Sequence, residues 1–235
     1  MAIKSFTHTS IPNVGYTQPK VQNVQGNRMY TNGKGVFHSI SFILKSIGND
    51  EQSLNAWKRA VGEENAKKTL RDAITRGNQF HELCESYLKN QCVCKYENNL
   101  LAYSLFSNVK SELNKIDNIM SIELPMISEE YGFAGKLDVL AEYNGVLSII
   151  DFKSSRKKKN EKYCKKWFLQ ETAYSLLVEE VLGIPVGQLV TISAAEDGTI
   201  EIFVKERDEF MPEIKLILKE FSSQHIQCEA CTIAS

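Results

Sequence analysis

Two carboxylates and one amine stand where two apolar segments of this chain meet polar surroundings. Asp138 interrupts one segment, Asp151 ends the next, and Lys153 follows two residues later. The two segments alternate as strands do, and Asn144-Gly145 between them is a strong hairpin signal. Ionised carboxylates among apolar residues are costly unless a positive charge pairs with them. We therefore expect a cation beside Asp138 and Asp151.

Oxygen ligands at adjacent strand ends suit Mg²⁺ or Mn²⁺, as one ion or two, and the backbone carbonyl of Phe152 could complete such a site. Lys153 points to the same face of its strand as Asp151, because side chains alternate along a strand. Such a metal activates water for phosphodiester hydrolysis, and the lysine can orient that water or neutralise developing charge. The alternative is a structural ion pair between Asp151 and Lys153.

A helical stretch beyond this segment carries polar side chains on one face. Lys166, Gln170 and Tyr174 recur at intervals of four, a spacing that suits hydrogen bonds to a phosphate backbone. Seven Lys or Arg residues lie between Arg156 and Lys166, opposed by Glu161. Such a run is often only a solvated face, but beside Asp151 and Lys153 it indicates an approach surface for nucleic acid.

Two further residues have both an ordinary and a functional interpretation. His81 lies on a stripe that spans Leu70, Ile74, Gly77, Cys84 and Leu88 at helical spacing. Alone it would indicate a hydrogen-bonded core histidine. Glu123 lies on a predicted strand, where it is either a surface carboxylate at the sheet edge or part of the site.

These motifs, taken in order, resemble the PD-(D/E)XK nuclease superfamily in its RecB-like branch. The matching segments are VFHSISFILK (36–45), GNQFHELCESYL (77–88), Glu123, GKLD (135–138), DFKSS (151–155) and Gln170-x-x-x-Tyr174. Within that branch the spacing is most similar to the mitochondrial genome maintenance exonuclease family and its phage-encoded exonuclease relatives, over roughly residues 36–182. Leu137 precedes Asp138 where the superfamily's name has proline.

The resemblance implies roles for individual residues. Asp138 and Asp151 would be the metal-binding carboxylates, Lys153 the catalytic lysine and His81 an additional metal ligand, with Glu123 matching an upstream catalytic glutamate. Gln170, Tyr174, Lys166, Ser154 and Arg156 would contact nucleic acid.

Periodicity along the chain predicts an α/β fold. A mixed central β-sheet flanked by helices, a restriction-endonuclease-like core, is expected because a helix separates strands that must share one sheet. The predicted strands are 121–127, 132–143, 146–152, 188–194 and 199–205. The predicted helices are 51–63, 64–90, 100–113, 161–182 and 207–222. Residues 36–46 are predicted as a short strand that runs into a helix capped by Ser39.

Four regions follow from this pattern. Residues 1–35 read as an extended or loosely ordered arm, 36–116 as a helical region with the histidine motif, 117–223 as the nuclease core and 224–235 as a tail. By the resemblance, the helices of about residues 39–90 would arch over the active site. Trp57, within them, is expected in the core.

Composition sets limits on these expectations. A net charge of −1 in 235 residues gives no global sign of nucleic-acid binding. Neither a secretory signal nor a membrane span is visible, so we expect a cytoplasmic protein, in the host cytoplasm if phage-encoded. The six cysteines are expected as free thiols, and an iron–sulfur or zinc site at Cys92, Cys94, Cys228 and Cys231 is not expected.

The sequence thus predicts a monomeric, Mg²⁺- or Mn²⁺-dependent deoxyribonuclease, an exonuclease acting on single-stranded DNA or frayed ends that needs a free end. Three alternatives stay open. They are a structure-specific endonuclease, a duplex-end resecting nuclease and an inactive DNA-binding module. Intact Asp138, Asp151 and Lys153 argue against the last of these.

Overall fold

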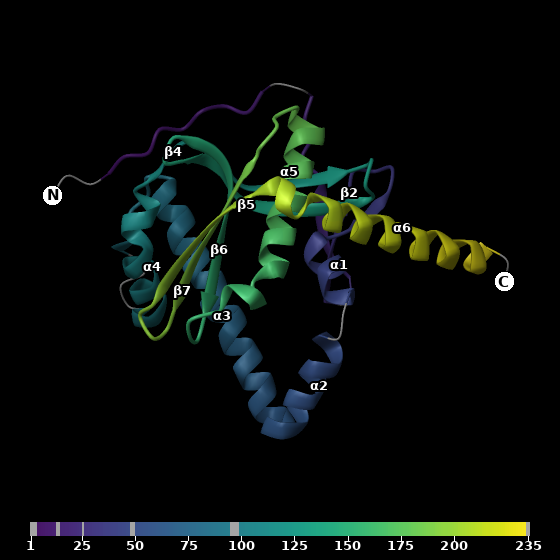
Figure 1. The fold of residues 1–235 in the computed structure, drawn as a ribbon, viewed down its shortest axis with the longest axis horizontal. Coiled ribbons are helices and arrows are strands. Elements are labelled where there is room, and N and C mark those ends of the chain that lie inside the picture. The colour runs from purple at the N-terminus through teal and green to yellow at the C-terminus, as the bar shows by residue number, and fades with distance from the viewer. Residues whose placement is uncertain (1–3, 13–14, 25, 48–49, 95–98, 234–235) are drawn as a thin grey trace.

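The fold is built on a five-stranded mixed sheet with helices on both faces (Figure 1). The computed structural model describes residues 4–12, 15–24, 26–47, 50–94 and 99–233. The strand order is β4-β5-β6-β7-β8. Their bounds are Ile116–Ser128, Phe133–Tyr143, Val146–Ser155, Gln188–Ala195 and Ile200–Glu206. The predicted α/β architecture with a mixed central sheet is confirmed.

One parallel pair makes the sheet mixed. All neighbouring strands are antiparallel except β6 and β7, which α5 (Lys165–Leu182) connects. A parallel pair needs a crossover of this length, whereas the antiparallel β5–β6 hairpin closes through Asn144 and Gly145. Both turn residues have positive φ, 52° and 80°, as a tight two-residue hairpin turn requires.

Helices cover both faces of the sheet, so its central strands are buried on both sides. On one face α3 (Glu63–Leu88) and α4 (Leu100–Leu113) form a core with Ile150. On the other face α5, α1 (Ile40–Ser46) and α6 (Met211–Ile233) pack with Ile149. Adjacent residues of β6 thus enter opposite cores, which explains the unbroken apolar run before Asp151.

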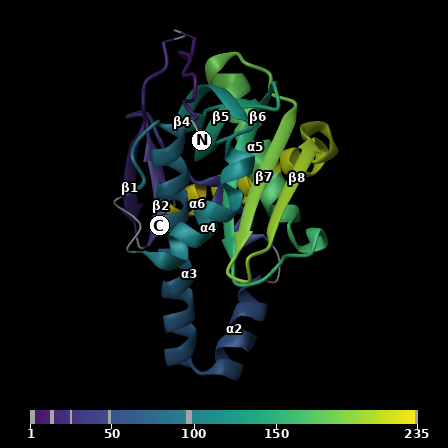
Figure 2. The same cartoon turned by 90° about the vertical axis from the view of Figure 1, so that its left-hand side faces the viewer.

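The helical hairpin of α2 (Asp50–Val61) and the first half of α3 projects away from the sheet (Figures 1 and 2). The predicted buried stripe of α3 is therefore only half correct. Ile74 is 64% exposed, whereas Cys84 and Leu88 are buried. Trp57 is only half-buried and belongs to neither core, so its expected core position is wrong. The apolar spacing alone did not reveal where α3 leaves the sheet.

The N-terminal region contains strands that the sequence pattern did not predict. β1 (Lys20–Val24), β2 (Asn27–Thr31) and β3 (Val36–His38) form a second, antiparallel sheet. Only the bounds of β3 and the cap of α1 were expected: the Ser39 side chain accepts a hydrogen bond from the Phe42 amide at 3.2 Å. The expectation of a loosely ordered arm is therefore corrected for these strands. Tyr30 of β2 is 1% exposed and anchors the sheet.

The cysteine expectation is partly wrong. Cys92 and Cys94 are joined by a disulfide, while Cys84 and Cys164 are free and buried. The two paired residues follow the end of α3, where a non-helical backbone brings their Cα atoms to 5.5 Å. The side chains of Cys228 and Cys231 lie outside the described residues. Among the described residues no helix combines the length and apolar character that a membrane span needs.

Gly135 on β5 sets how closely α5 approaches the sheet. A Cβ atom at this position would lie 2.6 Å from Cε1 of Tyr174 and 3.2 Å from Cδ1 of Leu177. We expect Gly135→Ala to lower the free energy of unfolding by about 1–3 kcal/mol, because α5 must shift to accept the methyl group. Urea denaturation measures this change.

The matched control is Gly187→Ala, where the nearest atom to the added Cβ is Oε2 of Glu206 at 4.0 Å. That variant should stay within about 0.5 kcal/mol of the wild type. Equal stabilities of the two variants would contradict the close packing of α5 on Gly135.

Candidate active site

A histidine–aspartate pair joins the second half of α3 to the middle of β5, so Asp138 does not lie at a strand end as expected. Nδ1 of His81 lies 3.2 Å from Oδ2 of Asp138, and the same oxygen accepts a hydrogen bond from the Phe152 amide at 2.9 Å. Asp138 is 8% exposed. The second half of α3 packs on the sheet and so carries His81 to this carboxylate. These two predicted site residues are thus neighbours in the fold.

Glu123 joins this pair because the backbone of β4 is distorted at this position. Its φ is 60° inside a strand, a conformation that is costly for a residue with a side chain. One ligand atom each of His81, Glu123 and Asp138 lie within 4.8 Å of one another. The Glu123 carboxylate also pairs with the Lys136 amine. Glu123 is therefore not an isolated surface carboxylate, although β4 is the edge strand of the sheet.

The donor set of His81, Glu123 and Asp138 could hold a divalent cation. One imidazole nitrogen and two carboxylates are ligands that Mn²⁺ accepts, and carboxylates with water suit Mg²⁺. Asp151 is not part of this group of three. The Phe152 ring is buried and its amide serves Asp138, while a ligand role of its carbonyl stays a prediction.

Asp151 is instead paired with Lys153 on the same strand. Its Oδ2 atom contacts the Lys153 amine but takes part in no hydrogen bond of regular geometry among the described residues. The pKa of Asp151 is raised to about 6, because burial and the charge of Asp138 together outweigh the opposing effect of Lys153. A buried carboxylate with an unsatisfied oxygen is one that an added cation would stabilise. Ion pair and metal ligand are therefore compatible roles for Asp151.

Charges of opposite sign shift the pKa values of the other cluster residues against the effect of burial. Burial alone would raise the pKa of Asp138, but His81, Lys153 and the Phe152 amide together lower it below the ordinary value. Burial acts to lower the pKa of His81, and the Asp138 carboxylate overcomes this and raises it. The pKa of Lys153 is likewise raised by Asp151 and Asp138 against the effect of its burial.

The glutamine and tyrosine of α5 are hydrogen-bonded to this cluster. Lys153 donates a hydrogen bond to Oε1 of Gln170 at 3.1 Å. Nε2 of Gln170 donates to the Tyr174 hydroxyl at 2.7 Å and to Oγ of Ser41 at 3.2 Å. Gln170 therefore fixes the position of the Lys153 amine and connects it to α1.

Glu171 is a buried acidic residue that the sequence reading missed. It is 0% exposed, and its Oε1 accepts a hydrogen bond from Thr191 of β7, the residue paired with Asp151 in the parallel ladder. Burial, with the nearby Asp151 charge, raises the pKa of Glu171 well above its usual range. Glu171 is therefore a second buried carboxyl group whose charge would interact with that of Asp151. Its position inside an otherwise apolar helix segment was the available signal.

Arg76 is a second missed residue, and it ties α3 to the sheet. It is 8% exposed, its Nε donates to Oγ of Ser154 at 3.3 Å, and its Nη1 pairs with Glu196. Ser154, predicted to contact nucleic acid, is thus engaged with α3. Arg76 precedes the histidine motif by a single residue, but nothing in the local pattern predicted its burial.

The other predicted nucleic-acid contacts lie at the edge of this cluster. Arg156 is exposed, as are most cations of the basic run. The amine of Lys166 donates to the Ile47 carbonyl at 3.3 Å and so helps to hold the end of α1. Roles for both residues in binding nucleic acid stay predictions.

The curated relatives that this chain is similar to are exonucleases. The chain is 30% identical to mitochondrial genome maintenance exonuclease 1 of Homo sapiens over 133 residues, 54% of this chain and 39% of that protein. It is 29% identical to the protein of the same name in Mus musculus over 127 residues, 52% of this chain and 38% of that one. The chain thus spans about two fifths of the length of these relatives. No family model matches it.

A solved structure is also similar in part. A protein of Eubacterium rectale that is provisionally described as an exonuclease aligns with a TM-score of 0.39 and 15% identity, over 63% of this chain and 68% of the other.

The raised pKa of Asp151 predicts how stability depends on pH when no metal is present. The folded state holds this proton up to about pH 6, whereas the unfolded chain releases it near the ordinary carboxyl pKa of about 3.9. The free energy of unfolding should therefore fall as pH rises between these values, by about 3 kcal/mol from this residue. Asp151→Asn should flatten that fall, leaving the part due to Glu171. Urea unfolding in a chelator across this pH range measures the slope.

Stability at a single pH is not the readout, because Asp151→Asn also removes the partner of Lys153. Asp117→Asn is the control, since Asp117 has a pKa lowered to about 2, chiefly by the Thr7 amide, and loses its stabilising effect only below the ordinary carboxyl pKa. If the free energy of unfolding of Asp151→Asn fell with pH as steeply as that of the wild type, the assignment of the raised pKa to Asp151 would be contradicted.

Proposed function

We propose that this protein is a metal-dependent nuclease of the PD-(D/E)XK superfamily that hydrolyses phosphodiester bonds in DNA. The observation that carries the proposal is the placement of His81, Glu123 and Asp138 within one ligand sphere beside the Lys153 amine. The names of the relatives, which match about half of this chain, support a nuclease. We further propose a monomer in the cytoplasm, or in the host cytoplasm if a phage encodes it.

The chain's own residues would divide the work of hydrolysis. His81, Glu123 and Asp138 would hold a Mg²⁺ or Mn²⁺ ion, which would polarise a phosphoryl oxygen and lower the pKa of a bound water. Lys153, fixed by Asp151 and Gln170, would neutralise charge that develops on the phosphate and orient the attacking water. The Tyr174 hydroxyl and the amide of Gln170 would hydrogen-bond to the DNA phosphate backbone next to the scissile bond.

The path of the chain supports action at a free end. The segment from Ser41 to His81 begins and ends at the cluster, since Ser41 contacts Gln170 and His81 contacts Asp138. Between these points α2 and the first half of α3 stand out from the body (Figure 1). An arch tied down on both sides of Lys153 would favour a single strand that enters from its end. We therefore propose an exonuclease for single-stranded DNA or frayed ends.

Lys153→Ala should abolish degradation of end-labelled single-stranded DNA in Mg²⁺ or Mn²⁺. We expect a fall of about a hundredfold or more in kcat, because the only amine beside Asp151 among the described ion pairs is removed. Lys219→Ala is the matched control: Lys219 is exposed on α6, outside the basic run, and this variant should retain nearly full activity. Undiminished hydrolysis by Lys153→Ala would rule out the proposed chemistry.

A covalently closed single-stranded circle tests the requirement for an end. Linear strands should be degraded and circles of the same sequence should resist, because a closed strand cannot pass under the arch. Gel electrophoresis of the two substrates in parallel, with a chelator control, measures this. Rapid cutting of circles would favour a structure-specific endonuclease, and binding without cutting of either would favour an inactive DNA-binding module.

A further inference from the structure

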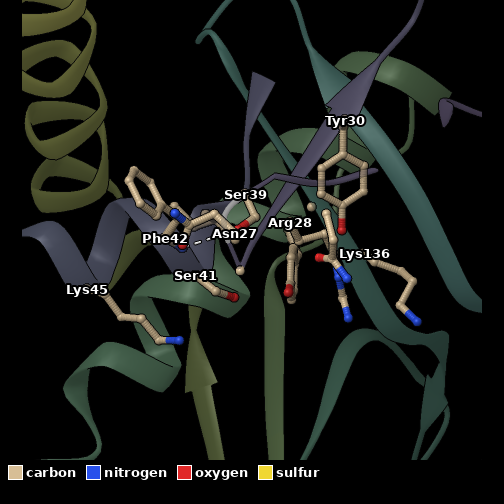
Figure 3. A pocket seen from close by; sticks show the side chains of 13 residues that line it. Asn27, Arg28, Tyr30, Ser39, Ser41, Phe42, Lys45 and Lys136 are labelled. Atoms are coloured by element: carbon tan, nitrogen blue, oxygen red, sulfur yellow. Dashed lines mark hydrogen bonds between the residues drawn. The ribbon is translucent and has the colours of Figure 1, made fainter. Parts of the chain in front are cut away.

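A polar cavity lies between the N-terminal sheet and the candidate active site. It has a volume of about 310 Å³ and is bounded by β2, α1, β5 and α5. Figure 3 shows Arg28 and Tyr30 of β2 on one side and Ser41 and Lys45 of α1 on the other. We call this cavity the hairpin pocket, after the β1–β2 hairpin that forms one wall.

The hairpin pocket is cationic. Arg28, Lys45 and Lys136 line it, and none of its described lining residues is acidic. Lys136 is neutralised by Glu123, but no described carboxylate pairs with Arg28 or Lys45. In a chain with a net charge of −1, this is a local concentration of positive charge in a concave surface, which attracts anions.

Arg28 lies beside a buried tyrosine and is itself exposed. Its positive charge lowers the pKa of the Tyr30 hydroxyl against the larger effect of burial, and Tyr30 is 1% exposed. An accessible guanidinium group presents its N–H donors in a planar fork that suits phosphate oxygens. Asn27 and Ser41 add neutral hydrogen-bonding groups to the lining.

Hydrogen bonds link the lining of the hairpin pocket to the catalytic cluster. Tyr174 and Ser41 line it, and both accept hydrogen bonds from Gln170, which in turn accepts one from Lys153. On the β5 side Lys136 lines it and pairs with Glu123 of the candidate metal site. A strand positioned for hydrolysis at Lys153 would therefore have its neighbouring nucleotide at the mouth of this cavity.

We infer that the hairpin pocket binds a phosphate group of the nucleic-acid strand next to the scissile bond, with Arg28 as the principal cation and Lys45 as the second. The volume is at the lower end of small-molecule sites and fits about one nucleotide. The identity of the ligand as a nucleotide rests on the proposed nuclease function; the anion-binding character rests on the pocket itself. The β1–β2 hairpin would then be part of the substrate site.

The test measures the binding of deoxyadenosine monophosphate to the full chain by calorimetry, with a chelator present and at low salt. This ligand carries a terminal phosphate, and the dinucleoside monophosphate of deoxyadenosine carries only an internal one. At least one of the two should bind, and deoxyadenosine should not. Arg28→Gln should weaken binding by at least about tenfold, as loss of a charged hydrogen bond predicts, and Lys45→Gln should weaken it less.

Lys20→Gln is the matched control, because it removes one charge from the same hairpin at the opposite end of the register and outside the pocket lining. It should bind as the wild type does, and thermal melts should show all variants folded. Equal affinity in wild type and Arg28→Gln, or no binding of either phosphate compound, would overturn the inference.

The two proposals fail in different ways. Hydrolysis of linear DNA by the wild type, measured separately with Mn²⁺, reports on the nuclease alone. DNA hydrolysis without nucleotide binding at Arg28 would contradict the role of the hairpin pocket and be consistent with the proposed nuclease function. Nucleotide binding that depends on Arg28, without hydrolysis, would contradict the proposed nuclease function and support anion binding in the hairpin pocket.

Discussion

The burial of two carboxylates at neighbouring strands is the constraint on which the rest of this structure depends. Asp138 and Asp151 are 8% and 1% exposed, and such groups persist only with compensating partners. Those partners come from every layer: His81 from α3 on one face, the Phe152 amide from β6, and Lys153 held by Gln170 of α5 on the other face. The helices on both faces are therefore needed for the charges as well as for the core.

The parts that could be predicted from sequence are those governed by local patterns. The β5–β6 hairpin followed from alternation and from Asn144-Gly145, and the position of Asp151 and Lys153 on β6 followed from it. The cap at Ser39 and the spacing of Gln170 and Tyr174 are likewise short-range features. Each depends on residues within about one turn or one strand, where the chain geometry leaves few alternatives.

The parts that could not be predicted depend on contacts between distant segments. The positive φ of Glu123 contradicts the ordinary preference of a glutamate in a strand. In the β1–β2 hairpin β1 is exposed throughout and only Tyr30 of β2 is buried, so no hydrophobic alternation marks it. Glu171 and Arg76 are polar residues whose burial follows only from Thr191 and Ser154, which other elements supply.

The segment from Ser41 to His81 leaves the body of the protein and rejoins it at one cluster. Its length can therefore change without moving the residues of that cluster. Lengthening a connection whose ends are already fixed costs little, about 0.6 kcal/mol for each doubling. Insertions or deletions at the exposed tip near Gly62 would therefore change the span of the arch and leave His81 and Gln170 in place. Under the proposed function, the width of the substrate admitted by the arch could therefore change in evolution without altering the residues that would hydrolyse it.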